Sequence, residues 1–276
     1  MKNAHGVAHY ENFPVASFLC PPALRPAIVA IYWFARTADD IADEGSAIPA
    51  QRLVDLQDYR TDLVACAAGA PTSSRWANVF TPLARVIQQH ALPVDLLADL
   101  LSAFEQDVAK TRYANQAELL DYCRRSANPV GRLLLNLYKV TDAQSLEQSD
   151  CICTALQLVN FWQDLGVDIE RGRIYLPADG FAQHGVDEAQ LLRLEVNPST
   201  TALVAANVAW AQALVQRGAP LAKKVPGRAG WELRLVVQGG LRIAEKIAQL
   251  RFATLQLRPK INAWDGVVML WRAMWM

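Results

Sequence analysis

Acidic side chains gather in two places in this sequence, each directly after a run of apolar residues. In the first group Asp39 and Asp43 are four positions apart, which places both carboxylates on one helix face with Arg36 beside them. Residues 27–35 before them are apolar almost throughout, which predicts a helix that is buried nearly all round. Carboxylates at the end of such a helix are costly unless a cation meets them, so the group is a candidate metal site.

The second group repeats this arrangement further along the chain. Asn160, Asp164 and Asp168 follow one another at intervals of four, and Gln157 lies one turn earlier. On a helix Gln157, Asp164 and Asp168 share one face with Asn160 at its edge, while the side chains between them are apolar. A solvated acidic face is the alternative for either group alone. The two groups together favour a cation site, because unpaired buried charge is costly.

Oxygen ligands of this kind suit hard cations, and Mg²⁺ is usually held by a few carboxylates together with water and substrate phosphates. Two facing helices could clamp several Mg²⁺ ions around one diphosphate, and the metal would stabilise the departing diphosphate. The apolar wall would then hold a hydrocarbon cation away from stray water. Di-iron bundles need Glu-x-x-His pairs and zinc sites need Cys and His clusters, and the sequence contains neither.

The elements that position these groups are predicted to be helices throughout. Almost every segment follows a helical period, and alternating strand-like runs are nearly absent. Asn115 with Glu118 resembles a capping box, and Pro129 should kink the helix that contains it. No repeat or linker divides the chain, so residues 1–276 are expected to form a single all-α domain. The expected helices cover residues 24–44, 50–68, 75–91, 94–112, 116–138, 146–171, 187–195, 199–217 and 230–256.

Composition narrows the class of function. Lysine plus arginine and aspartate plus glutamate both number 27, and this balance gives no electrostatic basis for binding nucleic acid. Five cysteines without a CxxC pair, and a first segment without a signal-type apolar core, favour reduced thiols in the cytoplasm. No stretch reaches the roughly 20 apolar residues of a membrane span. The Trp-rich segment 264–276 is either a final helix packed on the body or a peripheral anchor on the inner face of the cytoplasmic membrane.

The two acidic groups also resemble a known family. The runs DDIAD (39–43) and NFWQDLGVD (160–168) are similar to the two aspartate-rich motifs of squalene and phytoene synthases. The resemblance extends from His9 to about Pro259 and includes, in order, residues 104–113, 122–131 and 173–177. Within the family the chain most resembles the hydroxysqualene synthases of bacterial hopanoid pathways, on residues 9–17, 34–45 and 128–131.

The resemblance implies a prenyl-synthase helical bundle with a central substrate cavity, Mg²⁺ as cofactor and no nicotinamide cofactor. It implies that presqualene diphosphate is converted to hydroxysqualene by loss of diphosphate, rearrangement of the cation and capture of water. The partners would be this isoprenoid diphosphate and other enzymes of the squalene and hopanoid pathway. Two alternatives stay open: head-to-head condensation of two farnesyl diphosphates to presqualene diphosphate or squalene, and a non-catalytic isoprenoid-binding protein.

The resemblance also implies roles for individual side chains. Tyr122 matches a tyrosine associated with the cation intermediate, although a packed core tyrosine is the simpler interpretation. Arg36 is expected to act on the diphosphate, and a salt bridge to Asp39 or Asp40 is compatible with that role. The matched metal positions are Asp39, Asp43, Asn160, Asp164 and Asp168. The matched diphosphate positions are His9, Tyr10, Glu11, Asn12, Tyr32, Arg36, Gln157, Arg173 and Tyr175.

The chain departs from the family pattern at two positions. Gln163 stands where many relatives carry Arg before the first Asp of the second motif, so one direct charge on the diphosphate is missing. Ala244, in the segment 242–245, stands where some relatives carry Tyr. Both changes predict a differently shaped and wetter pocket, which would suit a water quench.

Overall fold

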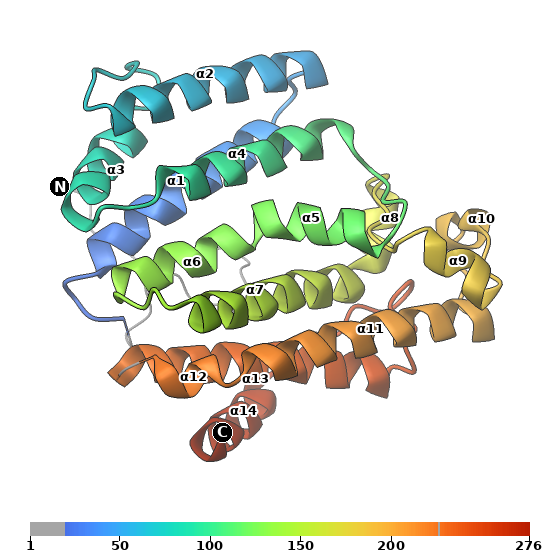
Figure 1. Cartoon of the computed structure of the whole chain (residues 1–276). Coiled ribbons are helices and arrows are strands. Elements are labelled where there is room, and N and C mark those ends of the chain that lie inside the picture. Colours follow the sequence, from blue (N-terminus) through green and yellow to red (C-terminus); the bar gives the residue numbers. More distant parts are fainter. Residues whose placement is uncertain (1–19, 226) are drawn as a thin grey trace.

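The computed structural model describes residues 20–225 and 227–276, and over these ranges the chain is helical, as predicted (Figure 1). The sole extended pairing in this part of the chain is one isolated parallel bridge between Arg112 and Ile174. The predicted diphosphate residues His9, Tyr10, Glu11 and Asn12 lie outside the described residues. The helices are α1 (Arg25–Asp43), α2 (Pro49–Ala67), α3 (Ala77–His90), α4 (Val94–Ala109), α5 (Gln116–Ser126), α6 (Asn128–Leu137), α7 (Ala143–Gln163), α8 (Leu165–Glu170), α9 (Asp179–His184), α10 (Glu188–Leu192), α11 (Pro198–Gly218), α12 (Leu221–Lys224), α13 (Gly227–Gln249) and α14 (Ala263–Trp275).

Local sequence signals explain where several helices begin and end. The Asn115 side chain accepts a hydrogen bond from the Glu118 amide at 2.9 Å, which is half of the predicted capping box. The Glu118 carboxylate bonds the amide of Ala114 instead of that of Asn115. Pro129 has the expected effect in a stronger form, since the helix predicted over 116–138 is divided at Ala127 into α5 and α6. A proline has no amide hydrogen and clashes with the preceding turn, so it is favoured near a helix start, where Pro129 lies in α6.

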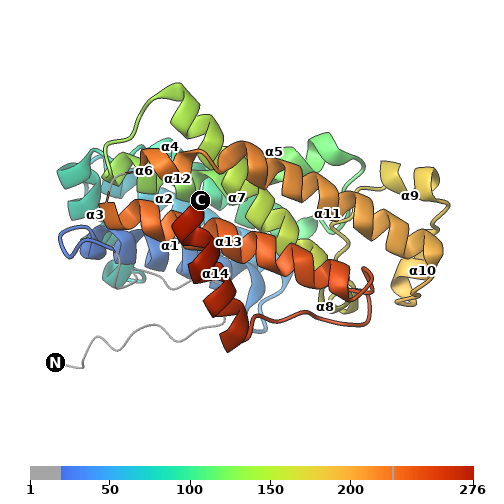
Figure 2. The same ribbon diagram turned by 90° about the horizontal axis from the view of Figure 1, so that it is seen from below.

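The buried side chains of the described residues form three cores, and the two that lie beside the acidic groups share α4 as their link (Figures 1 and 2). One core lies among α1, α2, α3 and α4 and contains Phe34, Tyr59 and Phe80. The other surrounds α7, which packs against α5, α6, α11 and α13, and it contains Tyr122 and Trp162. Because α4 packs against α1 on one side and against α5 and α6 on the other, it holds the first acidic group within reach of the second core.

The prediction that α1 is buried nearly all round is wrong. Ala30, Phe34 and Ala38 are buried, but Val29 is 39% exposed and Trp33 is 43% exposed. The helix therefore packs on α2, α3 and α4 with one face and leaves the other open. Val29 and Trp33 lie seven and three positions before Arg36, so they share its helical stripe, and an apolar surface leads toward the end of α1 that carries the acids.

Candidate active site

The first acidic group ends α1. Arg36 forms ion pairs with Asp40 at 2.7 Å and with Asp39 at 3.4 Å, so the predicted salt bridge is present. Tyr32 lies one turn earlier and stacks edge-on against Trp33. The pKa of Asp39 is raised to about 6, mainly by burial; Arg36 acts to lower this pKa, and the neighbouring carboxylates Asp43 and Asp40 act to raise it.

The second acidic group spans the end of α7 and the start of α8. Gln157 and Asn160 lie on α7, Asp164 stands at the junction, and Asp168 lies on α8. Asp164 accepts two hydrogen bonds from the guanidinium of Arg258, at 2.6 and 2.9 Å. Burial raises the pKa of Asp168 to about 7, and the Asp164 carboxylate adds to this effect.

Arg173 connects the two groups. Its Nη2 lies 2.5 Å from Asp43 Oδ1 and 3.4 Å from the backbone carbonyl oxygen of Asp107. The same guanidinium lowers the pKa of Asp39 in the first group and of Asp168 in the second. Both acidic groups are therefore within electrostatic reach of one cationic side chain, which is the arrangement that an anion-binding site between them would need.

The backbone around Arg173 is held by a segment that precedes it by about 60 residues in the chain. The amide of Ile174 donates to the carbonyl of Thr111 at 3.0 Å, and the amide of Ala178 donates to the carbonyl of Tyr113 at 3.0 Å. Arg112 strengthens this pairing through a 2.6 Å hydrogen bond to the Gly172 carbonyl. The pairing explains why α4 ends at Ala109, earlier than predicted, and it brings two of the family-like segments side by side.

Four aromatic rings lie next to the acidic groups. Phe161 and Tyr175 stack with ring centroids 3.7 Å apart and planes inclined by 5°. Tyr122 lies 6.2 Å from Phe161 and 6.3 Å from Tyr175, and Tyr113 is 5.6 Å from Tyr122. Tyr122 is thus a packed core tyrosine, as its simpler interpretation predicts, and its ring also belongs to an aromatic cluster (Tyr113, Tyr122, Phe161 and Tyr175) whose faces could stabilise a cation.

Asp107 on α4 belongs to this site, although it was not among the predicted residues. Its Oδ2 accepts a 2.8 Å hydrogen bond from the Tyr122 hydroxyl. Burial raises the pKa of Asp107 to about 7, against the lowering effects of Tyr122 and Arg173. A sequence signal exists: Leu100 and Ala103 are buried at the positions seven and four before Asp107, so this acid lies on the buried stripe of its helix.

The raised pKa of Asp107 predicts that it destabilises the fold as the pH rises. Asp107 releases its proton near pH 3.8 in the unfolded chain and near pH 7 in the folded protein. Between these pH values folding binds a proton, so a rise in pH opposes folding. Between about pH 4 and above about pH 7 the free energy of unfolding is expected to fall by about 1 kcal/mol or more through this group. Melting temperatures are measured by circular dichroism at about pH 5 and about pH 7.5. The difference between the two melting temperatures should be smaller in Asp107→Asn than in the wild type. Equal differences would contradict this role.

The two departures from the family pattern do not produce a wetter pocket at their own positions. Gln163 is 3% exposed and donates a 2.8 Å hydrogen bond to the carbonyl of Pro259. Ala244 is 0% exposed within the core of α13. The expectation is wrong at both positions, because neither side chain borders a space that water can enter. Gln163 instead helps Arg258 to fix the segment after α13 beside Asp164.

The acidic groups fit Mg²⁺ better as a shared site than as a cage of protein ligands. Among residues 20–225 and 227–276, no three His, Cys, Asp or Glu side chains meet closely enough to hold an ion alone. The donors are oxygen atoms, and the pKa values of Asp39 and Asp168 are raised first by burial and then by neighbouring carboxylates, both of which a bound cation would offset. Mg²⁺ commonly uses one or two carboxylates and takes its other ligands from water and phosphate, so the fit is good.

Comparison with known proteins agrees with the geometry. A family model described as squalene/phytoene synthase matches residues 7–265. A hydroxysqualene synthase of Zymomonas mobilis is 40% identical over 68% of this chain, and the match spans 61% of that protein, less than two thirds. A hydroxysqualene synthase of Sinorhizobium fredii is 33% identical over 91% of this chain and 83% of that one.

A solved structure shows the same fold. The crystal structure of the squalene synthase HpnC from Alicyclobacillus acidocaldarius superposes with a TM-score of 0.81 at 35% identity, covering 88% of this chain and 90% of that chain. Because this match covers most of both chains, the all-α prenyl-synthase fold is confirmed. On the family match and the shared fold, the chain belongs to the squalene/phytoene synthase family, and within it most resembles the hydroxysqualene synthases.

Proposed function

We propose that this protein converts presqualene diphosphate to hydroxysqualene, with release of diphosphate and capture of water. The relatives named hydroxysqualene synthase support this substrate and product. The observation that carries the proposal is the position of Arg173, which lies between the two acidic groups and two positions before Tyr175 of the aromatic cluster. An anionic leaving group and a cationic hydrocarbon would be bound side by side in such a site.

The polar end of the site is suited to the diphosphate. Asp39, Asp43, Asn160, Asp164 and Asp168 would hold Mg²⁺, which neutralises the charge of a leaving diphosphate when it is bound. Arg36 and Arg173 already lie among these carboxylates and can turn their guanidinium groups toward phosphate oxygens. Tyr32, Gln157 and Tyr175 are proposed to contact the diphosphate in the same region. The family resemblance assigns this role to residues 9–12 as well, which lie outside the described residues.

The aromatic cluster is suited to the hydrocarbon. Phe161 and Tyr175 present stacked rings, and a cation above an aromatic face is stabilised by the ring electrons. Tyr122 is held in place by the hydrogen bond from its hydroxyl to Asp107. This hydrogen bond leaves the oxygen of Tyr122 as an acceptor toward positive charge, so the residue is proposed to stabilise the cation during rearrangement.

The proposed reaction balances without an added reductant or oxidant. The carbon–oxygen bond to the diphosphate breaks, and both electrons leave with the diphosphate. The cyclopropylcarbinyl cation rearranges, a water oxygen forms the new carbon–oxygen bond, and that oxygen then releases one proton. A separate enzyme would have to reduce the resulting alcohol to squalene, which gives this protein a place in the squalene and hopanoid pathway.

Product analysis with two substrates tests the proposal. Purified protein is incubated with Mg²⁺ and presqualene diphosphate or, separately, with farnesyl diphosphate, and the extracted products are separated by mass. Hydroxysqualene from presqualene diphosphate alone supports the proposal. Conversion of farnesyl diphosphate to presqualene diphosphate or squalene would support head-to-head condensation instead, and binding without diphosphate release would support a non-catalytic carrier.

A further inference from the structure

The last helix, α14, crosses α13 on the outside of the bundle (Figure 2). It turns a wholly apolar face away from the bundle. The side chains of this face recur at helical spacing over three turns. Each is between 53% and 77% exposed, and none carries a charge. This α14 face consists of Trp264, Val267, Leu270, Trp271, Met274 and Trp275.

The charged residues of α14 point the other way. Asp265 is 1% exposed and pairs with Arg242 at 2.7 Å and with Lys246 at 2.5 Å, both on α13. Arg272 pairs with Glu245, also on α13. A helix that only covers a core would bury its apolar side and expose its charges. The ion pairs of α14 anchor it to the body and keep its apolar face outward.

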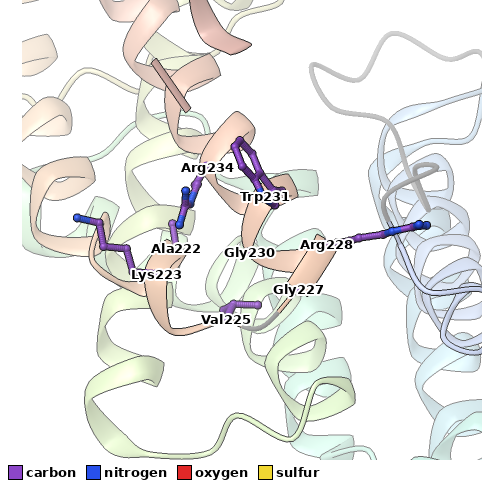
Figure 3. Close-up of a pocket in the computed structure, with 8 residues that line it drawn as sticks. All are labelled: Ala222, Lys223, Val225, Gly227, Arg228, Gly230, Trp231 and Arg234. Atoms are coloured by element: carbon purple, nitrogen blue, oxygen red, sulfur yellow. The ribbon is translucent and has the colours of Figure 1, made fainter. Parts of the chain in front are cut away.

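Basic side chains flank both ends of this face. At the carboxyl end a hollow of about 450 Å³ is lined by Lys223, Arg228, Trp231 and Arg234 (Figure 3). Arg234 lies 5.1 Å from the Trp231 ring centre and donates to the Ala273 carbonyl at 3.4 Å, which places the hollow beside the end of α14.

At the amino end Lys260 is exposed two residues before the N-cap of α14, Asn262. Pairing two copies through this face, parallel or antiparallel, would therefore bring basic ends together and cause repulsion.

We propose that the α14 face docks on the surface of an anionic phospholipid bilayer. Tryptophan side chains favour the boundary between headgroups and acyl chains, and the flanking lysine and arginine side chains would contact lipid phosphates. With 13 residues α14 is about 20 Å long, too short to cross a hydrocarbon layer of about 30 Å, so it lies in the plane of the interface. No helix among residues 20–225 and 227–276 meets the length and hydropathy that a membrane crossing requires.

Sedimentation with vesicles tests the apolar contact. The full chain is mixed with vesicles of phosphatidylcholine containing phosphatidylglycerol, without substrate, so the outcome is independent of catalysis. The double variant Trp271→Ser and Trp275→Ser should bind at least about tenfold more weakly, because two large apolar side chains no longer enter the interface. A matched control, Val64→Ser with Leu192→Ser, changes two other exposed apolar residues and should bind like the wild type.

The charge contribution has its own variants. Lys223→Glu with Arg228→Glu should weaken binding to the anionic vesicles by about tenfold or more, since each basic residue near the surface contributes about 1 kcal/mol. Arg85→Glu, an exposed basic position on α3, should have little effect. Unchanged binding by the tryptophan variant, or no binding by the wild type, would overturn the proposal. So would a wild-type dimer that the tryptophan variant converts to monomer while neither binds vesicles.

Discussion

Asp39→Asn is expected to lower the turnover of presqualene diphosphate by a factor of about 1,000 or more, while the helices stay intact. The substitution keeps the size of the side chain and removes the charge that would hold Mg²⁺ at the end of α1. Asp168→Asn should have a similar effect from the second acidic group. Reaction rates at saturating substrate test the loss of turnover, and circular dichroism spectra test whether the helices stay intact.

Stability separates loss of function from loss of fold in these variants. Burial raises the pKa of Asp39 to about 6 and of Asp168 to about 7, so each carboxylate is destabilising near neutral pH when no metal is bound. Both variants should therefore unfold at the same or a slightly higher temperature than the wild type without metal. Asp58→Asn, at an exposed position on α2, should leave turnover unchanged. Near-normal turnover in both acidic variants would contradict the proposed metal site.

Tyr122→Phe is expected to lower turnover by about 10- to 100-fold with little change in KM. The phenyl ring keeps its place near Phe161 and Tyr175, so hydrocarbon binding is retained. The hydroxyl oxygen is lost, and with it the proposed stabilisation of the cation and the hydrogen bond to Asp107.

Another buried tyrosine provides the matched control for Tyr122→Phe. The Tyr59 hydroxyl donates to the backbone carbonyl of Phe34 at 3.1 Å, in the core among α1 to α4. Tyr59→Phe should cost about 1 kcal/mol of stability and leave the rate constant unchanged. Equal activity of Tyr122→Phe and the wild type would show that Tyr122 only packs in the core.

The first acidic group could be found from the sequence because Asp39 and Asp43 lie four positions apart on one helix and share a face whatever that helix packs against. The helix predicted over 146–171 is instead divided at Asp164 into α7 and α8, but the amide of Asp168 still donates to the carbonyl of Asp164 at 2.9 Å, so these two acids keep their one-turn spacing. The division of the chain at Pro129 was likewise a local effect, since a proline disturbs only the turn before it.

Other features depend on residues that are distant in the chain. Arg258 pairs with Asp164 across 94 positions, and Gln163 reaches Pro259 across 96, so no local pattern predicts either contact. The exposure of Trp33 on α1 depends on which neighbours the fold supplies, because an apolar run alone does not say how many sides are covered. The central substrate cavity and the metal stay predictions from the family resemblance.

The final helix, α14, bears on both alternatives for the Trp-rich segment 264–276. The Trp-rich segment after Asn262 is a helix packed on the body, as one alternative had it. Its ion pairs with α13 leave its apolar outer face exposed, and the proposed docking on a membrane uses that face. Composition alone could not separate a packed helix from a peripheral anchor, because the direction of each side chain depends on the contact between α13 and α14.

The source of the oxygen in the product tests the central proposal most directly. Presqualene diphosphate and Mg²⁺ are supplied in water enriched in the heavy oxygen isotope, with and without NADPH, and the product is analysed by mass spectrometry. The expected product is an alcohol that carries the heavy oxygen and forms equally in both reactions, and chelation of Mg²⁺ should abolish it. Squalene that forms only when NADPH is present, or product formation that survives chelation, would contradict the proposed reaction.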